Sequence, residues 1–304
     1  MALMDLVTGC VLGLALGDAL GAPFGSRRAK DLPSPLPAFA LPGKGLAPGA
    51  TTHDTAMARS LVRSLGERGG FNAEDLVARH LEWFRGEPSD VGTFTRRVLR
   101  RVSRGAKAED AARAVWLERG PEAAAGNGSV AYCAPLGAAY ANRPGRLFEL
   151  APRLSALTHF DARCGSAVLA VTLASAALVR GEPREDAVRT AISSVLDRDG
   201  GEEIEYLTGA VGTRRPIDGP DQGFCLFAAA AGLQALLQDG DVEPSLLWVV
   251  SLGGDTSANG AVAGALLGAA SGRAGLPATW LRALRAATEI EAEAERLVPL
   301  AAST

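Results

Sequence analysis

The sequence predicts an all-α protein that forms one compact domain over residues 1–304. Hydrophobic residues make up 47% of the chain but aromatic residues only 5%, so Ala and Leu on closely packed helices should fill the core. Apolar residues recur at helical spacing, whereas no stretch alternates convincingly between apolar and polar residues. No internal repeat, linker or low-complexity tail divides the chain.

The first predicted helix, residues 5–22, is apolar on nearly all sides and should lie at the centre of the fold. Its glycines recur every four residues, which places one smooth seam along the helix. A second ladder of this kind predicts another packing seam near the C-terminal end. Pro23 ends the first helix, and a loop rich in Pro and Gly follows over residues 25–50. The two ladders are Gly9, Gly13, Gly17 and Gly21, and Gly260, Gly264 and Gly268.

The remaining elements follow from helical periodicity and from breaks rich in Gly and Pro. Long loops are predicted at 120–128 and 213–222. The segment 206–212 is irregular and could hold a short strand or part of a lid-like loop. Helices are predicted at 55–68, 73–85, 91–104, 108–118, 130–141, 147–157, 162–180, 184–196, 224–238, 242–250, 258–271 and 277–297.

Charge and cysteine content exclude several classes of protein. The formal net charge is −3 with both signs interspersed, which argues against a nucleic-acid platform. Scattered cysteines without a C-x-x-C pair indicate neither a zinc knuckle nor a disulfide framework. We therefore expect a protein of the reducing cytoplasm. The densest basic cluster reads as one solvated helix face and comprises Arg96, Arg97, Arg100, Arg101 and Arg104.

Neither secretion nor a membrane span is predicted. The apolar run from Leu6 to Phe24 lacks a basic leader and contains Asp18, so it is not typical of a signal peptide. The longest uncharged stretches, 164–179 and 223–238, fall short of the roughly 20 apolar residues that a spanning helix needs.

Two acidic turns, residues 51–55 and 253–259, are the strongest functional signal in the residues themselves. Each comes just before a long helical run, where backbone N–H groups are unpaired and short oxygen-bearing side chains collect. Carboxylate and hydroxyl oxygens are the ligands that Mg²⁺ and Mn²⁺ prefer. If the fold brings the two turns together, they predict a site for a divalent cation that faces a cleft.

Seven short motifs stand in the order seen in the ADP-ribosylglycohydrolase family, the relatives of dinitrogenase-reductase-activating glycohydrolase. The sequence resembles that family over essentially its whole length. The motifs are Gly13-Leu14-Ala15-Leu16-Gly17-Asp18-Ala19-Leu20-Gly21-Ala22-Pro23, Thr52-His53-Asp54-Thr55-Ala56-Met57-Ala58, Asp90-Val91-Gly92, Gly126-Asn127-Gly128-Ser129, Ala134-Pro135-Leu136-Gly137, Thr158-His159-Phe160-Asp161 and Gly253-Gly254-Asp255-Thr256.

The resemblance implies an orthogonal bundle of helices with two Mg²⁺ or Mn²⁺ ions at the base of a cleft. It also implies that ADP-ribose or an ADP-ribosylated substrate is the partner, and that the bond from ribose C1″ to an acceptor is hydrolysed. Cleavage of this bond develops oxocarbenium character, so positioned ribose hydroxyls and an activated water would lower its barrier. The acceptor, whether arginine, serine, nucleic acid or a small molecule, stays open.

Carried over residue by residue, the resemblance assigns three kinds of site residue. Asp54 and Asp90 match acidic positions linked to catalysis. The loop residues Asn127, Gly128 and Ser129, with Gly253 and Gly254, match substrate-binding positions. The expected metal ligands are Thr52, His53, Asp54, Asp255 and Ser257.

The metal turns depart from the family pattern. His53 stands where the family has its central aspartate, Ser257 where it has an acidic ligand, and Ala258 where it has a hydroxyl ligand. Asp54 and Asp255 supply two negative charges against the four positive charges of a divalent pair. A neutral imidazole suits Mn²⁺ or Zn²⁺ better than Mg²⁺. We therefore expect one weakly held ion or none.

Three functional hypotheses remain open. The first is a hydrolase with an altered metal centre, and the second is a catalytically inactive relative that binds ADP-ribose or a related nucleotide, or serves as a scaffold. The third is a metal-independent hydrolase of another ribosyl compound.

Several further residues have predicted structural roles. Asp18, in an apolar helix, should hold the site residues in place. His159 and Asp161 should cap a helix, and His80 should be half-exposed. Cys133 lacks a histidine partner and is not expected to be a nucleophile.

Overall fold

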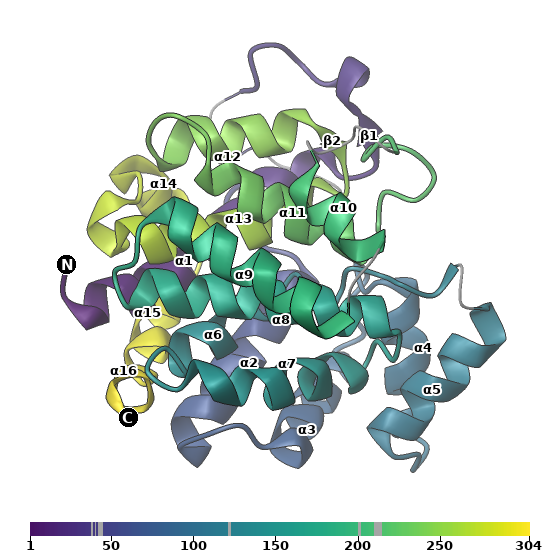
Figure 1. The fold of residues 1–304 in the computed structure, drawn as a ribbon. Coiled ribbons are helices and arrows are strands. Elements are labelled where there is room, and N and C mark those ends of the chain that lie inside the picture. Colours follow the sequence, from purple (N-terminus) through teal and green to yellow (C-terminus); the bar gives the residue numbers. More distant parts are fainter. Residues whose placement is uncertain (38, 40, 42–44, 121–122, 200–201, 210–214) are drawn as a thin grey trace.

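The computed structural model describes residues 1–304 except 38, 40, 42–44, 121–122, 200–201 and 210–214. The described residues are largely helical, which confirms the predicted all-α class (Figure 1). The helices are α1 (Leu3–Gly21), α2 (His53–Arg68), α3 (Ala73–Phe84), α4 (Thr93–Val102), α5 (Ala108–Arg119), α6 (Ala134–Ala139), α7 (Leu147–Ala156), α8 (Ala162–Val179), α9 (Arg184–Asp199), α10 (Glu202–Thr208), α11 (Cys225–Leu236), α12 (Val242–Ser251), α13 (Thr256–Ser271), α14 (Ala278–Ala283), α15 (Ala287–Glu295) and α16 (Val298–Ala302).

Short 3-10 turns and one small sheet complete the described secondary structure. The 3-10 turns are η1 (Ala22–Phe24), η2 (Ala29–Asp31), η4 (Pro144–Arg146) and η5 (Arg273–Gly275). The two-residue strands β1 (Arg27–Arg28) and β2 (Gly253–Gly254) pair antiparallel, with Arg27 opposite Gly254. The sequence did not predict this pairing, because two residues are too few to show an alternating pattern.

Helices α1 and α13 meet along the two predicted glycine ladders. A β-carbon built on Gly13 or Gly17 would overlap the carbonyl oxygen of Gly264 or Gly260 on the facing helix. The backbones therefore approach so closely that only glycine fits, which confirms the seam. This contact brings the C-terminal end of α1 beside the N-terminal end of α13, because Gly21 faces Thr256.

The most apolar helices form the centre of the core. Leu3–Phe24 and Ala162–Val179 are long and apolar enough to cross a membrane by length and composition. In the fold, 83% and 89% of these windows are buried, so core packing accounts for their apolar sequence. Cys133 is fully buried nearby, and burial raises the pKa of its thiol well above the usual range. It is therefore not an activated nucleophile.

Helices α4 and α5 form a hairpin with a small hydrophobic cluster of its own (Figure 1). Phe94 and Val98 of α4 pack there against Ala112 and Val115 of α5. The basic face of α4 points outward, as predicted, with exposed side chains at Arg97, Arg100 and Arg104.

Three segments differ from the predicted elements. The helix predicted over 130–141 shortens to α6, because residues 130–133 form turns. The helix predicted over 277–297 breaks between α14 and α15, where Ala286 has φ +57° and Arg285 N donates to Gly49 O. Residues 206–208 end helix α10 rather than forming a strand, whereas 210–212 lie outside the described residues.

His80 is fully buried, so the expectation of a half-exposed side chain was wrong. Its ring stands edge-on to Tyr132 at 5.5 Å between ring centroids, and within the described part of the chain neither ring nitrogen has a hydrogen-bond partner. Burial lowers the pKa of His80 to about 3, so the imidazole is neutral. Helical periodicity gives the position of His80 on its own helix but not the residues of other segments, such as Tyr132, that cover it.

Candidate functional site

The N-terminal end of α2 is held by Asp18 from the middle of α1. Its Oδ2 accepts hydrogen bonds from Thr52 N at 2.9 Å, Thr55 N at 3.1 Å and Thr55 Oγ1 at 2.6 Å. Burial raises the pKa of Asp18, and these hydrogen bonds oppose the rise. Thr52 Oγ1 accepts from Asp54 N at 3.2 Å and caps the helix. The buried carboxylate thus fixes the turn that carries Asp54, as expected.

The N-terminal end of α13 is held by its backbone and by one hydroxyl. Gly253 and Gly254 have φ of +72° and +76°, and a β-carbon at either would meet neighbouring backbone atoms. Thr256 Oγ1 donates to Gly21 O at 2.7 Å, which joins this turn to the end of α1. The turn therefore presents Asp255 in one defined position.

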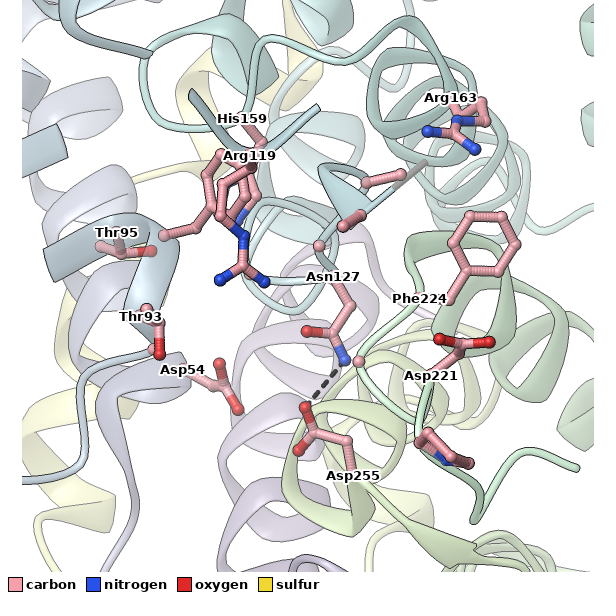
Figure 2. A pocket seen from close by; sticks show the side chains of 18 of the residues that line it. Asp54, Thr93, Thr95, Arg119, Asn127, His159, Arg163, Asp221, Phe224 and Asp255 are labelled. Atoms are coloured by element: carbon pink, nitrogen blue, oxygen red, sulfur yellow. Dashed lines mark hydrogen bonds between the residues drawn. The ribbon is translucent and has the colours of Figure 1, made fainter. Parts of the chain in front are cut away.

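The two acidic turns converge on one cavity of about 320 Å³. Asp54 and Asp255 both line it, and Asn127 stands beside Asp255 (Figure 2). Asn127 Nδ2 donates a hydrogen bond of 2.9 Å to Asp255 Oδ2. Of the predicted site residues, those in the lining are His53, Asp54, Asn127, Gly128 and Asp255.

The other predicted site residues do not line this cavity. Ser129 is fully buried, and its hydroxyl lies 3.0 Å from the hydroxyl of Ser155. Ser257 Oγ lies 3.4 Å from Asp255 Oδ1 and supports that carboxylate from the side. Thr52, Asp90, Gly253 and Gly254 likewise stand outside the lining.

His53 lies against two carboxylates. Its Nε2 is 3.3 Å from Asp54 Oδ1, and its backbone N donates a hydrogen bond of 2.6 Å to Asp90 Oδ2. Its Nδ1 is 3.7 Å from Asp90 Oδ2, too far for a hydrogen bond, so this attraction is electrostatic. Burial alone would lower the pKa of His53, but the negative charges of Asp54 and Asp90 outweigh it and raise the pKa to about 9. The side chain is therefore a cation at neutral pH.

The carboxyl group of Asp54 titrates near neutrality. Burial raises its pKa to about 7; the charge of His53 opposes this rise, and the carboxylates of Asp18 and Asp255 reinforce it. Asp90 behaves differently, because its contacts with His53 outweigh its partial burial and lower its pKa. The cavity thus contains a carboxyl group that can accept or release a proton at physiological pH.

The predicted substrate loop is built on the ring of His159. A β-carbon on Gly128 would lie 2.8 Å from His159 Cε1, so the loop can pass over the ring only with glycine there. His159 Nδ1 lies 2.9 Å from Thr158 Oγ1, and burial lowers the pKa of the ring to about 4. The expected capping role falls to Asp161 alone, which accepts from Arg163 N at 3.0 Å. The His159 side chain supports the loop and lines the cavity instead.

Sequence reasoning missed much of the cavity's outer wall. Phe94 and Arg119 come from the α4–α5 hairpin, and Asp221 and Phe224 come from the loop before α11 (Figure 2). Gly126 bridges to Phe224, and Asn127 N donates to Gly223 O at 2.8 Å, so the two loops are joined. No motif marks these residues, because they meet only through the tertiary fold.

The carboxylates of the acidic pair are partnered by neighbouring side chains. Within the described ranges, no group of three or more His, Cys, Asp or Glu side chains could hold a metal ion. The oxygens of Asp255 are engaged by Asn127 and Ser257. Those of Asp54 face His53 at 3.3 Å and Thr52 Oγ1 at 3.4 Å. A divalent ion bound at Asp54 would share this carboxylate with the His53 ring.

Comparison with known proteins gives one consistent result. The protein-family model described as ADP-ribosylglycohydrolase matches residues 1–304. The ADP-ribosyl-[dinitrogen reductase] glycohydrolase of Rhodospirillum rubrum is 27% identical and is matched over 98% of this chain and 97% of its own. The ADP-ribosylhydrolase ARH3 of Bos taurus is 26% identical, over 95% of this chain and 91% of its own.

A solved structure titled "ADP-ribosylglycohydrolase-related protein complex" superposes with a TM-score of 0.83. It is 33% identical in sequence, and the match covers 98% of this chain and 99% of that one.

Proposed function

Because the chain belongs to the ADP-ribosylglycohydrolase family, we propose that it hydrolyses the glycosidic bond between ADP-ribose and an acceptor in the cavity between α2 and α13. One observation carries the proposal. Asp54 and Asp255 come from opposite ends of the chain, yet both line the cavity beside the loop that contains Asn127 and Gly128. Relatives in two domains of life have names that state this chemistry.

In the proposed reaction, water attacks ribose C1″ and the bond from C1″ to the acceptor breaks. The water oxygen stays on C1″, and one water proton passes to the acceptor. Asp54 suits the role of general base and then acid, because its pKa of about 7 lets it take and return this proton. Asp255, oriented by Asn127, places negative charge where the ribose develops positive charge.

The proposed centre differs from the dinuclear site that the family resemblance implies. His53 supplies positive charge beside Asp54 and Asp90, and the nearby carboxylates lack a three-ligand cluster among the described residues. We therefore place at most one weakly held Mg²⁺ or Mn²⁺ in this cavity, and no step of the proposed hydrolysis runs through it. A bound ion would polarise ribose hydroxyls or a water.

A second candidate function is binding of ADP-ribose without turnover. The engagement of both Asp255 oxygens, by Asn127 and by Ser257, favours it, because these contacts compete with a reacting water for the same carboxylate. The cavity and its loop would be retained for recognition in this case.

The decisive experiment measures release of free ADP-ribose from ADP-ribosylated arginine and serine peptides. Each peptide is tested with Mg²⁺, with Mn²⁺ and with an excess of chelator. We expect release under all three conditions. Asp54→Asn should lower the rate by about 10²- to 10⁴-fold, the usual effect of removing a general acid or base. Asp110→Asn is the matched control, since Asp110 is exposed on α5 and outside the cavity.

The outcomes separate the candidates. Release that survives the chelator supports the altered centre, whereas release that vanishes with it contradicts that centre but keeps the hydrolase. Absence of release from both peptides, with ADP-ribose still bound in calorimetry, favours the binding function. Absence of both release and binding refutes the proposal.

A further inference from the structure

Arg119 places a positive charge over the cavity from outside the predicted motifs. It is the last residue of α5, and its guanidinium points into the hollow, on the side of Asn127 away from Asp255 (Figure 2). Gly126 of the substrate loop follows Arg119 closely in sequence and lines the same cavity. Arg119 and that loop therefore face one hollow.

A stack of rings supports Arg119. Its guanidinium carbon lies 5.9 Å from the centroid of the Phe94 ring, and Phe94 stacks on His159 at 5.5 Å between centroids. His159 in turn lies against Gly126 and Gly128. The cation thus lies over the outer ring of a stacked pair whose inner ring supports the substrate loop, although the Arg119 side chain is itself exposed.

Arg119 differs from the other two arginines of the cavity in its partners. Arg163 pairs with Asp161 at 2.8 Å, and Arg215 pairs with Asp221 at 3.5 Å. The Arg119 side chain makes no ion pair or hydrogen bond with any residue that the structure describes. Among those residues none engages its five N–H donors, which a ligand in the cavity could use.

We propose that Arg119 binds the diphosphate of ADP-ribose and so selects phosphorylated ligands over nucleosides and free sugars. This inference rests on the proposed function, and it assigns recognition of the substrate's diphosphate to Arg119. A guanidinium offers two parallel N–H donors that match two phosphate oxygens. Asp54 and Asp255 repel the same phosphates, so the two ends of the cavity orient the ligand with its ribose toward the carboxylates.

Isothermal titration calorimetry at low ionic strength tests the inference with two probes, ADP-ribose and inorganic pyrophosphate. Arg119→Ala should weaken both by about 10- to 100-fold, as expected for loss of charge-assisted hydrogen bonds. Arg119→Lys should recover part of the affinity, because it keeps the charge but not the fork. Arg113→Ala, an exposed arginine on the same helix outside the cavity, should bind like the wild type.

A further readout separates ligand binding from folding. The affinity of the wild-type protein should fall more steeply with added KCl than that of Arg119→Ala, because one phosphate contact is lost. The urea midpoint should be the same for both proteins.

The calorimetric results test the role of Arg119 and the proposed function separately. Equal affinity of wild type and Arg119→Ala for ADP-ribose overturns the inference and leaves the proposed function standing. If the wild type binds pyrophosphate through Arg119 but does not bind ADP-ribose, the anion site stands and the proposed function falls. If it binds neither probe, both fall.

Discussion

Replacing His53 with Gln should weaken the pH dependence of stability on the alkaline side of neutrality. In the wild type, His53 lies 3.3 Å from Asp54 Oδ1 and close to Asp90, and its pKa rises from 6.5 to about 9. A raised pKa in the folded state stabilises the fold fully below pH 6.5, and this stabilisation disappears as the pH rises through about 9.

The magnitude follows from the two pKa values. At pH 7 the native preference for the protonated ring contributes about 2.5 kcal/mol, and at pH 9.5 it contributes only about 0.2 kcal/mol. In the wild type Asp54 titrates near pH 7, but without the neighbouring cation its pKa rises further, so in His53→Gln this carboxyl group loses its proton within the same pH range. The wild type should therefore lose only about 1 kcal/mol more than His53→Gln between pH 7 and pH 9.5.

At pH 7 itself the variant should lose less than the full amount. Without the neighbouring cation the pKa of Asp54 rises further, and the carboxyl group takes up a proton instead. We expect a loss of about 1–2 kcal/mol at this pH.

The assay is urea unfolding followed by far-UV circular dichroism, at constant ionic strength, between pH 7 and pH 9.5. Taking the difference between variant and wild type cancels the titration of groups away from the site, though not that of Asp54. His80→Leu is the matched control, because the His80 ring is neutral throughout this range and the variant should keep the wild-type slope. In an NMR titration of the wild type the His53 ring should lose its proton near pH 9, and a ring that titrates near pH 6.5 would refute the assignment of a cationic His53.

Other predictions test the fold around the site. His80→Leu should resist acid better than the wild type: the lowered pKa of His80 means that stability is lost as the pH falls below 6.5, by about 2 kcal/mol at pH 5 in urea titrations. Gly17→Ala should cost about 1–3 kcal/mol of unfolding free energy because its β-carbon overlaps Gly260 O, whereas Gly165→Ala, with ordinary contacts, should be neutral or slightly stabilising. Asp18→Ala removes the acceptor of Thr52 N, Thr55 N and Thr55 Oγ1 and should lower the free energy of unfolding by about 1–3 kcal/mol, and an unchanged urea midpoint would contradict the role given to Asp18.

Local patterns predicted the parts of the fold that depend on neighbouring residues in sequence. The four-residue spacing of Gly9, Gly13 and Gly17 predicted a close contact between helices. In the structure these glycines pack against the second glycine ladder, which begins at Gly260. The N-cap at Asp161 followed from its position before an apolar helical run.

Other features depended on packing that no local pattern records. The burial of His80, the break at Ala286 and the supporting role of the His159 ring arise from contacts with distant segments. The orientation of Arg119 over Phe94 arises in the same way. Helical periodicity gives the direction of a side chain from its own helix, but not the identity of what lies opposite.

The order of motifs alone was enough to determine the family and the all-α class, since periodicity and turn residues are local properties of the chain. The tertiary structure decided which of the matched residues share a cavity. Asp54 and Asp255 line the same cavity, whereas Ser129 is buried behind the substrate loop, with its hydroxyl beside that of Ser155. The His53 ring lies against Asp54. The pKa values of these groups depend on burial and on charges from distant segments, so they exist only once the helices have packed.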